Sequence, residues 1–222
     1  MELPPREQLH QELEALIDSD VRREHDCRKF LEPVKDSLFK ETVINHLYHE
    51  IEYRGHTGDA DYAISGKVAD EGGVQCVRAY IWELKAPQCY IFEKDTQNRL
   101  RPTEDLVDAE NQLLYYFHEQ KGSNKFLNDF CVQSDYVHPG GIIIGCLRTR
   151  VHGDYEEAKK LTLYRDALNI RSTYFYKGAG IKLVTWDFIL EQLRPPRTGI
   201  FQPNMLEQTQ VPRLDKDKVT GF

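Results

Sequence analysis

The feature of this sequence that most constrains its fold is a pair of strand-type segments joined by a short glycine loop. Residues 55–66 are bounded by glycines, residues 74–86 are rich in β-branched and aromatic side chains, and Glu71–Gly73 lies between the two segments. Glycine tolerates positive φ, so a three-residue loop here predicts an antiparallel hairpin in which Asp70 faces Val74. This register decides the face of the sheet on which every other side chain of the two strands lies.

Counting outward from the loop places Asp61 opposite Glu83. Strand side chains alternate between faces, so Glu83 and Lys85 share one face. Directly opposed residues have β-carbons about 5 Å apart, a spacing at which two carboxylates repel each other unless a cation lies between them. A divalent ion with oxygen ligands removes that repulsion, so we expect a Mg²⁺ or Mn²⁺ site formed by Asp61 and Glu83. Asp59 stays open as the alternative ligand on the first strand.

The other segments predict an α/β protein in which a mixed β-sheet is flanked by helices. A hairpin comes first and crossover connections follow it. The expected helices are residues 5–18, 34–51, 103–122 (capped by Thr103), 153–169 (opened by a capping box of Asp154 and Glu157) and 187–193; the expected strands after the hairpin are 140–146 and 181–186, and 92–102 is a polar loop. We expect an N-terminal helical arm (1–33), a main domain (34–194) and an extended tail (195–222).

Composition and net charge indicate where the protein is located and which kinds of partner it can bind. The chain has 222 residues and a net charge of −7, so bulk charge cannot hold nucleic acid, and DNA binding would need a local basic patch or a metal ion. No run reaches the roughly 18 apolar residues of a membrane-spanning helix. The N-terminus shows no signal peptide, and the five cysteines have no pairing pattern. We expect a cytoplasmic protein with reduced thiols and no membrane association.

Two short motifs resemble the PD-(D/E)xK nuclease superfamily. One is Asp61 in "GDADYAIS" followed by Glu83-x-Lys85 in "WELKAP". The other is Gln112-x-x-x-Tyr116 in "AENQLLYYF", which is similar to a Gln-x-x-x-Tyr element of exonuclease-type members. The resemblance implies that the two acids bind the catalytic metal and that Lys85 activates water or stabilises charge on the phosphate. It also implies that Gln112 orients a ligand near the metal, with Tyr116 supporting it from the same helix.

Over residues 45–192 the succession "ADYAI … IWELKAP … DAENQLLYYF … GGIIIGC … KLVTWDFIL" resembles the C-terminal nuclease domain of the Shedu anti-phage defence proteins. The sequence departs from the superfamily pattern in having Ala60, rather than proline, before the acid. The resemblance implies a restriction-endonuclease-like core, and an endonuclease that hydrolyses DNA phosphodiester bonds in defence against phage or other foreign DNA.

Further residues near these motifs are candidates for supporting roles. Glu50 and Glu52 precede the hairpin, and members of the superfamily often supply an extra acid from this region; we take Glu50 as the candidate third metal ligand. His56, in "RGHTGD", lies near the expected site and is a candidate phosphate contact, and the basic pair Arg148 and Arg150 is a candidate contact for the DNA backbone.

Two alternatives stay open at this level. Glu83 and Lys85 could form ion pairs on a surface strand, where the lysine would discourage edge-to-edge aggregation. The fold could also be kept as a DNA-binding or protein-interaction module that lacks catalysis. Because the N-terminal helix is amphipathic and the tail is long, we also expect a homo-oligomer.

Overall fold

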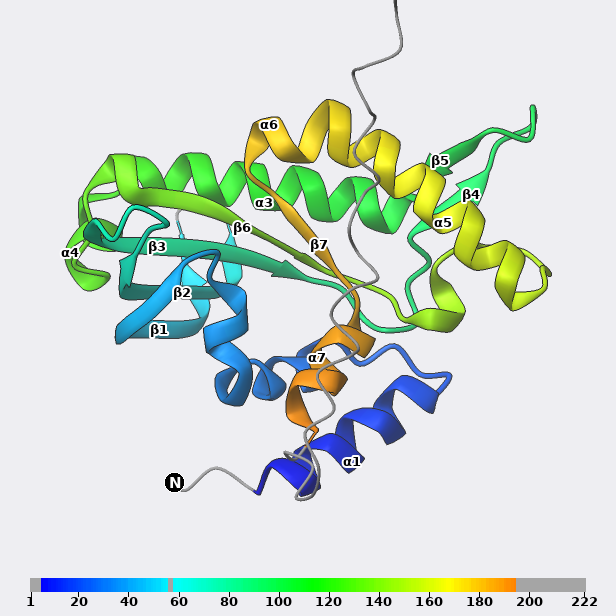
Figure 1. The fold of residues 1–222 in the computed structure, drawn as a ribbon, viewed down its shortest axis with the longest axis horizontal. Helices are drawn as coiled ribbons and strands as arrows, with labels where there is room; N and C mark the ends of the chain where they lie inside the picture. The colour runs from blue at the N-terminus through cyan, green and yellow to red at the C-terminus, as the bar shows by residue number, and fades with distance from the viewer. Residues whose placement is uncertain (1–4, 56–57, 195–222) are drawn as a thin grey trace, which may run out of the picture.

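The computed structural model describes residues 5–55 and 58–194, which form a five-stranded mixed sheet with helices on both faces (Figure 1). The strand order is β1-β2-β3-β6-β7; β1, β2 and β3 are antiparallel, whereas β3, β6 and β7 run parallel. The strands are β1 (Thr42–Arg54), β2 (Asp59–Ala69), β3 (Gln75–Leu84), β6 (Val137–Ile143) and β7 (Lys182–Val184), and β4 (Phe92–Lys94) pairs with β5 (Leu100–Pro102) in a separate hairpin. The predicted α/β class with a mixed sheet is confirmed.

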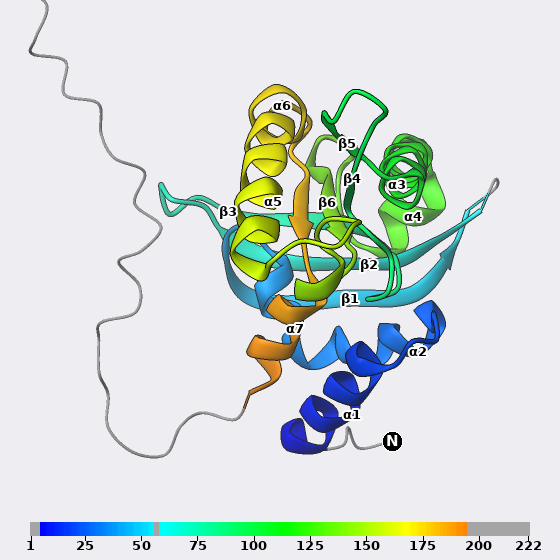
Figure 2. The same cartoon turned by 90° about the vertical axis from the view of Figure 1, so that its right-hand side faces the viewer.

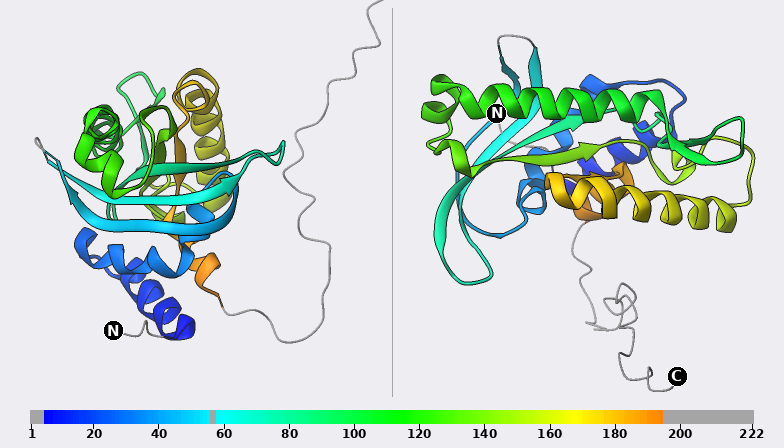
Figure 3. Two further views of the ribbon diagram at one scale, coloured as in Figure 1. Left: turned by 90° about the vertical axis from the view of Figure 1, so that its left-hand side faces the viewer. Right: turned by 90° about the horizontal axis from the view of Figure 1, so that it is seen from above.

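The helices form one layer on each face of the sheet (Figure 2). One layer contains α3 (Glu104–Gly122), α4 (Asn124–Asp129), α5 (Glu157–Arg171), which continues through the π-helical turn η5 (Ser172–Tyr176), and α6 (Lys177–Ala179). The other contains α1 (Arg6–Asp18), α2 (Glu24–Cys27), the 3₁₀ helices η1 (Arg28–Phe30) and η2 (Glu32–Leu38), and α7 (Trp186–Leu193). Two further 3₁₀ turns, η3 (Ser134–Tyr136) and η4 (Leu147–Thr149), flank β6. The view from the opposite side shows the same layering (Figure 3, left).

Each face of the sheet has its own apolar core. On the α3 side, Ala63 of β2 and Ile81 of β3 pack with buried residues of α3 and α5. On the α1 side, Tyr62 and Trp82 pack with buried residues of α1 and α7. Neighbouring residues of β2 and β3 thus enter opposite cores, as the two-residue period of a strand requires. Both faces of these central strands are covered, which explains their nearly continuous apolar sequence.

The register of the central hairpin is the one predicted from its loop. β2 pairs with β3 from Ala69↔Gln75 to Tyr62↔Trp82. Beyond Ala69↔Gln75, the Asp70 amide donates a hydrogen bond to the Val74 carbonyl at 3.1 Å. In the loop, Gly73 has a φ of 76°, a conformation that only glycine adopts readily.

The prediction of a helix over residues 34–51 is wrong. Glu32–Leu38 form the 3₁₀ helix η2, and Thr42–Arg54 form β1, an edge strand. The register of β1 against β2 shifts at Ile44 and again at Leu47. Each shift adds one residue to the strand, so its apolar side chains recur at intervals of three and four and imitate a helical pattern.

Smaller predictions had mixed outcomes. The Thr103 hydroxyl caps α3 by accepting a hydrogen bond from the Leu106 amide, as expected. The expected polar loop at 92–102 is instead the β4–β5 hairpin. The expected capping box is absent from α5, because that helix begins at Glu157 with Glu156 at the N-cap and no side-chain cap bond.

Two observations concern the ends of the chain and the membrane. The tail expected at 195–222 lies outside the described residues. Among the residues that the structure describes, no helix has both the length and the apolar character needed to cross a bilayer.

Candidate active site

The end of β3 places Lys85 beside β6 and α7. The Lys85 amide donates a hydrogen bond to the Ile143 carbonyl of β6 at 2.8 Å. Its carbonyl accepts a hydrogen bond at 2.7 Å from the indole of Trp186, the first residue of α7. Both backbone groups are therefore fixed, although the strand itself ends at Leu84. The lysine side chain starts from a rigid point on the same face as Glu83.

Three of the predicted residues form a hydrogen-bonded chain. The Lys85 ammonium donates to Glu83 Oε1 and to Gln112 Oε1, each at 2.7 Å. Gln112 comes from α3, the helix that packs against β3 and β6 on this face. The glutamine amide oxygen and the Glu83 carboxylate thus both hold the ammonium, and the sequence motifs on β3 and α3 meet at one point.

Asp61 is the acid across the hairpin from Glu83. The pairing of β2 with β3 reaches Tyr62↔Trp82, so Asp61 and Glu83 are the next facing positions. The Leu84 amide donates to Asp61 Oδ2 at 2.9 Å, which fixes the carboxylate against β3. Asp61 is only 6% exposed, whereas Asp59 is an exposed residue at the start of β2. Of the two alternatives that the sequence left open, Asp61 is the one that reaches this site.

Arg28, which the sequence interpretation did not include, also reaches the site. It belongs to η1, and its Nη2 lies 2.6 Å from Asp61 Oδ1. Its Nη1 pairs with the carboxylate of Glu52 on β1. The guanidinium therefore bridges two acids, and on Asp61 it pairs with Oδ1, the oxygen that the Leu84 amide does not bond.

Glu24 of α2 is a second unforeseen neighbour. Its Oε1 lies 4.0 Å from the Lys85 ammonium. Burial raises the pKa of Glu24, and the Asp61 carboxylate raises it further, whereas Lys85 opposes the shift. The N-terminal segment thus contributes one carboxylate, that of Glu24, and one cation, the Arg28 guanidinium, to the site. The sequence signal was the charged run "REHDCRK", but nothing local in that run specifies which strand it meets.

The electrostatics of Glu83 are unusual for a glutamate. Burial and the facing Asp61 carboxylate raise its pKa to about 8, although the Lys85 ammonium acts in the opposite direction. Burial alone would lower the pKa of Lys85, but the Glu83 carboxylate raises it above its usual value. The second oxygen of Glu83, Oε2, is buried and has no hydrogen-bond partner. A carboxylate oxygen in this state is a suitable ligand for a cation.

Tyr116, one helical turn after Gln112, lies at the edge of the same cluster. Its ring covers Gly58, where a β-carbon would lie 2.9 Å from the phenol oxygen. Burial raises the pKa of Tyr116, and the carboxylates of Glu83 and Asp61 add to the increase. The tyrosine therefore experiences the field of the two acids.

Glu50 is not brought into this cluster. The Glu50 residue pairs with Ala63, and its carboxylate accepts a hydrogen bond from the Tyr48 hydroxyl at 2.5 Å. Glu52, rather than Glu50, is the acid of β1 that Arg28 joins to Asp61. His56 lies outside the described residues.

Arg148 and Arg150 both make contacts inside the protein. Arg148 pairs with the Ile17 carbonyl, and its Nη2 lies 3.4 Å from Asp18 at the end of α1. The Arg150 guanidinium lies 5.1 Å from the centre of the Tyr164 ring. These contacts give both arginines structural partners.

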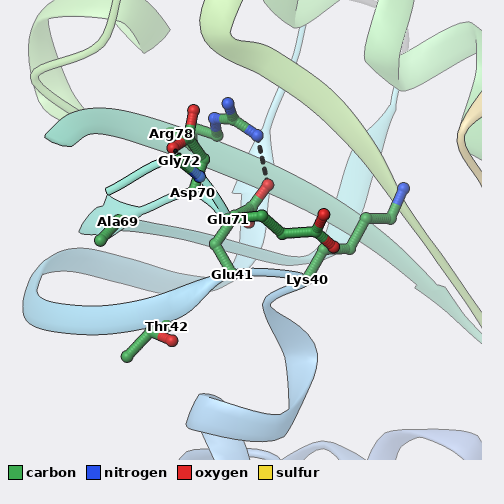
Figure 4. Close-up of a pocket in the computed structure, with 8 residues that line it drawn as sticks. All are labelled: Lys40, Glu41, Thr42, Ala69, Asp70, Glu71, Gly72 and Arg78. Carbon is green, nitrogen blue, oxygen red and sulfur yellow. Dashed lines mark hydrogen bonds and ion pairs between the residues drawn. The ribbon is translucent and has the colours of Figure 1, made fainter. Parts of the chain in front are cut away.

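A separate pocket of about 440 Å³ lies beside the hairpin loop, at the far end of β2 and β3 from Asp61 and Glu83 (Figure 4). Glu41 pairs with Arg78 there and accepts hydrogen bonds from the Tyr80 hydroxyl at 2.6 and 2.7 Å. Glu41 and Arg78 are therefore paired with each other, and none of the predicted site residues lines this pocket.

The donor set at Asp61 and Glu83 suits a small divalent cation. Within residues 5–55 and 58–194, no group of three or more His, Cys, Asp or Glu side chains could hold a metal ion. Mg²⁺, however, commonly binds proteins through only one or two carboxylates and completes its shell with water and substrate phosphate. The unpartnered Glu83 Oε2 and the repulsion between the two facing acids fit such an ion.

Comparisons with known proteins neither support nor oppose this interpretation, since no family model and no curated protein matches this chain.

Proposed function

We propose that this protein is a divalent-metal-dependent DNA endonuclease that acts in the cytoplasm in defence against phage or other foreign DNA. One observation carries the proposal: the Lys85 ammonium bonds Glu83 and Gln112, and Asp61 is the facing residue across the hairpin. This set resembles that of the PD-(D/E)xK nucleases, and the mixed sheet is compatible with a restriction-endonuclease-like core.

Each residue has a chemical task in this proposal. Asp61 and Glu83 would hold Mg²⁺ or Mn²⁺, which when bound lowers the pKa of a coordinated water and polarises a phosphate oxygen. Lys85 presents a fixed positive charge where negative charge grows on the phosphate. Gln112 accepts a hydrogen bond from the ammonium at 2.7 Å and so keeps it oriented.

The experiment that tests the proposal is cleavage of plasmid DNA with Mg²⁺ or Mn²⁺. We expect the wild type to cleave and Lys85→Ala to lose activity by about 100-fold or more. Lys67→Ala is the matched control, because Lys67 is an exposed lysine of β2, the strand paired with β3. Equal cleavage by the wild type and Lys85→Ala would remove Lys85 from the mechanism.

A binding module without catalysis is the second candidate function. The observation that favours it is that the site residues already have partners within the protein: Arg28 pairs with Asp61, and the Lys85 ammonium bonds Glu83 Oε1. A titration with Mn²⁺ distinguishes the two candidates. Saturable binding that Asp61→Asn removes supports the nuclease, whereas the absence of such binding supports the module.

We further propose that the chain forms a homo-oligomer. The apolar face of α1 does not argue for this, because Leu9, Leu13 and Ile17 are buried within the chain. The support comes from the edge strand β1, which exposes Ile44 and Leu47. Light scattering should give a mass well above 25.9 kDa, and a mass near this value would refute the oligomer.

A further inference from the structure

The segment between α1 and η1 crosses the candidate active site at several points. We call residues 19–28 the strap. Gln88, just beyond Lys85, donates hydrogen bonds to the Leu16 and Ser19 carbonyls at 2.9 and 2.8 Å. Arg22 forms a two-pronged ion pair with Asp105 at the start of α3, at 3.1 and 3.2 Å. The strap is therefore tied both to the loop after β3 and to the helix that carries Gln112.

One side chain of the strap stands where a metal ion would need to be. The Arg28 guanidinium lies 2.6 Å from Asp61 Oδ1, while the Leu84 amide lies 2.9 Å from Oδ2. Both oxygens of Asp61 thus have partners, and the Arg28 side chain is only 13% exposed. An ion ligated by Oδ1 must displace the guanidinium, because two cations cannot share that oxygen without strong repulsion.

Another side chain of the strap stands where a phosphate would need to be. Glu24 Oε1 lies 4.0 Å from the Lys85 ammonium, which also bonds Glu83 and Gln112. A DNA phosphate approaching Lys85 would meet the Glu24 carboxylate at close range. The strap therefore places the Arg28 guanidinium on Asp61, the expected metal ligand. It also places the Glu24 carboxylate beside Lys85, the expected phosphate contact.

We propose that the strap is an internal inhibitor of the site, in which Arg28 excludes the metal from Asp61 and Glu24 excludes phosphate from Lys85. This inference rests on the proposed nuclease function. Cys27 and Phe30 are buried and anchor the backbone of α2 and η1, so in this proposal the site opens when the two side chains turn away. Once turned away, Arg28 can pair with a DNA phosphate, so that DNA binding and metal binding favour each other.

Mn²⁺ affinity of the full chain, measured by calorimetry, tests the role of Arg28. We expect Arg28→Gln to bind Mn²⁺ about tenfold more tightly than the wild type. Lys29→Gln, the matched control, should bind as the wild type does, because Lys29 pairs with Glu12 away from the site. Equal or weaker binding by Arg28→Gln beside a wild type that binds Mn²⁺ would overturn the inhibitor role and leave the nuclease proposal intact. Absence of binding in both proteins would overturn both proposals.

Binding of a short DNA duplex in EDTA tests Glu24 separately and leaves Arg28 in place. We expect Glu24→Gln to bind the duplex several-fold more tightly than the wild type. Glu14→Gln, an exposed position on α1, is the control and should not change the affinity. Unchanged duplex binding would overturn the role of Glu24. A loss of Mn²⁺ affinity in Glu24→Gln would also overturn it, because Glu24 would then be a metal ligand.

Discussion

The raised pKa of Glu83 makes the stability of the metal-free protein depend on pH. Glu83 titrates near pH 8 in the folded protein, against 4.5 as its ordinary value. Between these limits the folded state holds a proton that the unfolded chain has lost. The folded state therefore binds more protons, and the free energy of unfolding falls as the pH rises. Glu83→Gln carries no charge at any pH and removes this dependence.

The size of the effect follows from the two pKa values. One proton corresponds to about 1.4 kcal/mol per pH unit across the interval, and the slope flattens as the pH nears 8. From about pH 5.5 to about pH 7.5, the free energy of unfolding of Glu83→Gln should therefore gain about 2.5 kcal/mol relative to that of the wild type.

Urea unfolding in EDTA at three pH values across this range measures the difference. Glu71→Gln, an exposed change in the hairpin loop, serves as the control and should follow the wild type at every pH. A difference between Glu83→Gln and the wild type that stays constant with pH would refute the reasoning. It would mean that Glu83 is ionised in the folded state as it is in water, and that the facing acids do not repel each other.

Three further changes test how the surrounding structure supports the site. Glu110→Ala should lower stability by about 3–5 kcal/mol in thermal or urea unfolding, because it leaves Arg171, its partner on α5, as a partly buried charge without its carboxylate; a loss below 1 kcal/mol would contradict this. Leu13→Ala should lower stability by about 3 kcal/mol, because Leu13 is fully buried, and an unchanged urea midpoint would mean that α1 does not belong to the core. Gly141→Ala should unfold at a clearly lower temperature, because its β-carbon would lie 2.2 Å from the Lys182 carbonyl oxygen of β7, and an unchanged melting temperature would contradict this close approach.

The hairpin and its site residues could be predicted from the sequence because their positions follow from local rules. The loop with Gly73 fixes the register, and the two-residue period then places Asp61 opposite Glu83 and puts Lys85 on the same face as Glu83. The same rules failed for β1, where bulges at Ile44 and Leu47 break the period on which strand prediction depends.

The contribution of the N-terminal segment could not be predicted in the same way. Arg28 and Asp61 are 33 positions apart, and their contact depends on how α2 and η1 pack beneath the sheet. Charge patterns identify exposed or paired residues in general, but they do not name a distant partner. Glu52 reaches the site through Arg28, which is why the choice between Glu50 and Glu52 could not be made from the sequence.

The central claim is that Asp61 and Glu83 together hold a divalent ion. Anomalous diffraction from a crystal grown with Mn²⁺ tests it most directly. We expect one strong manganese peak bonded to oxygens of both residues at about 2.1–2.2 Å, with the Arg28 guanidinium turned away from Asp61. A crystal with manganese bound elsewhere, or with none bound, and with Arg28 still paired to Asp61 would contradict the account.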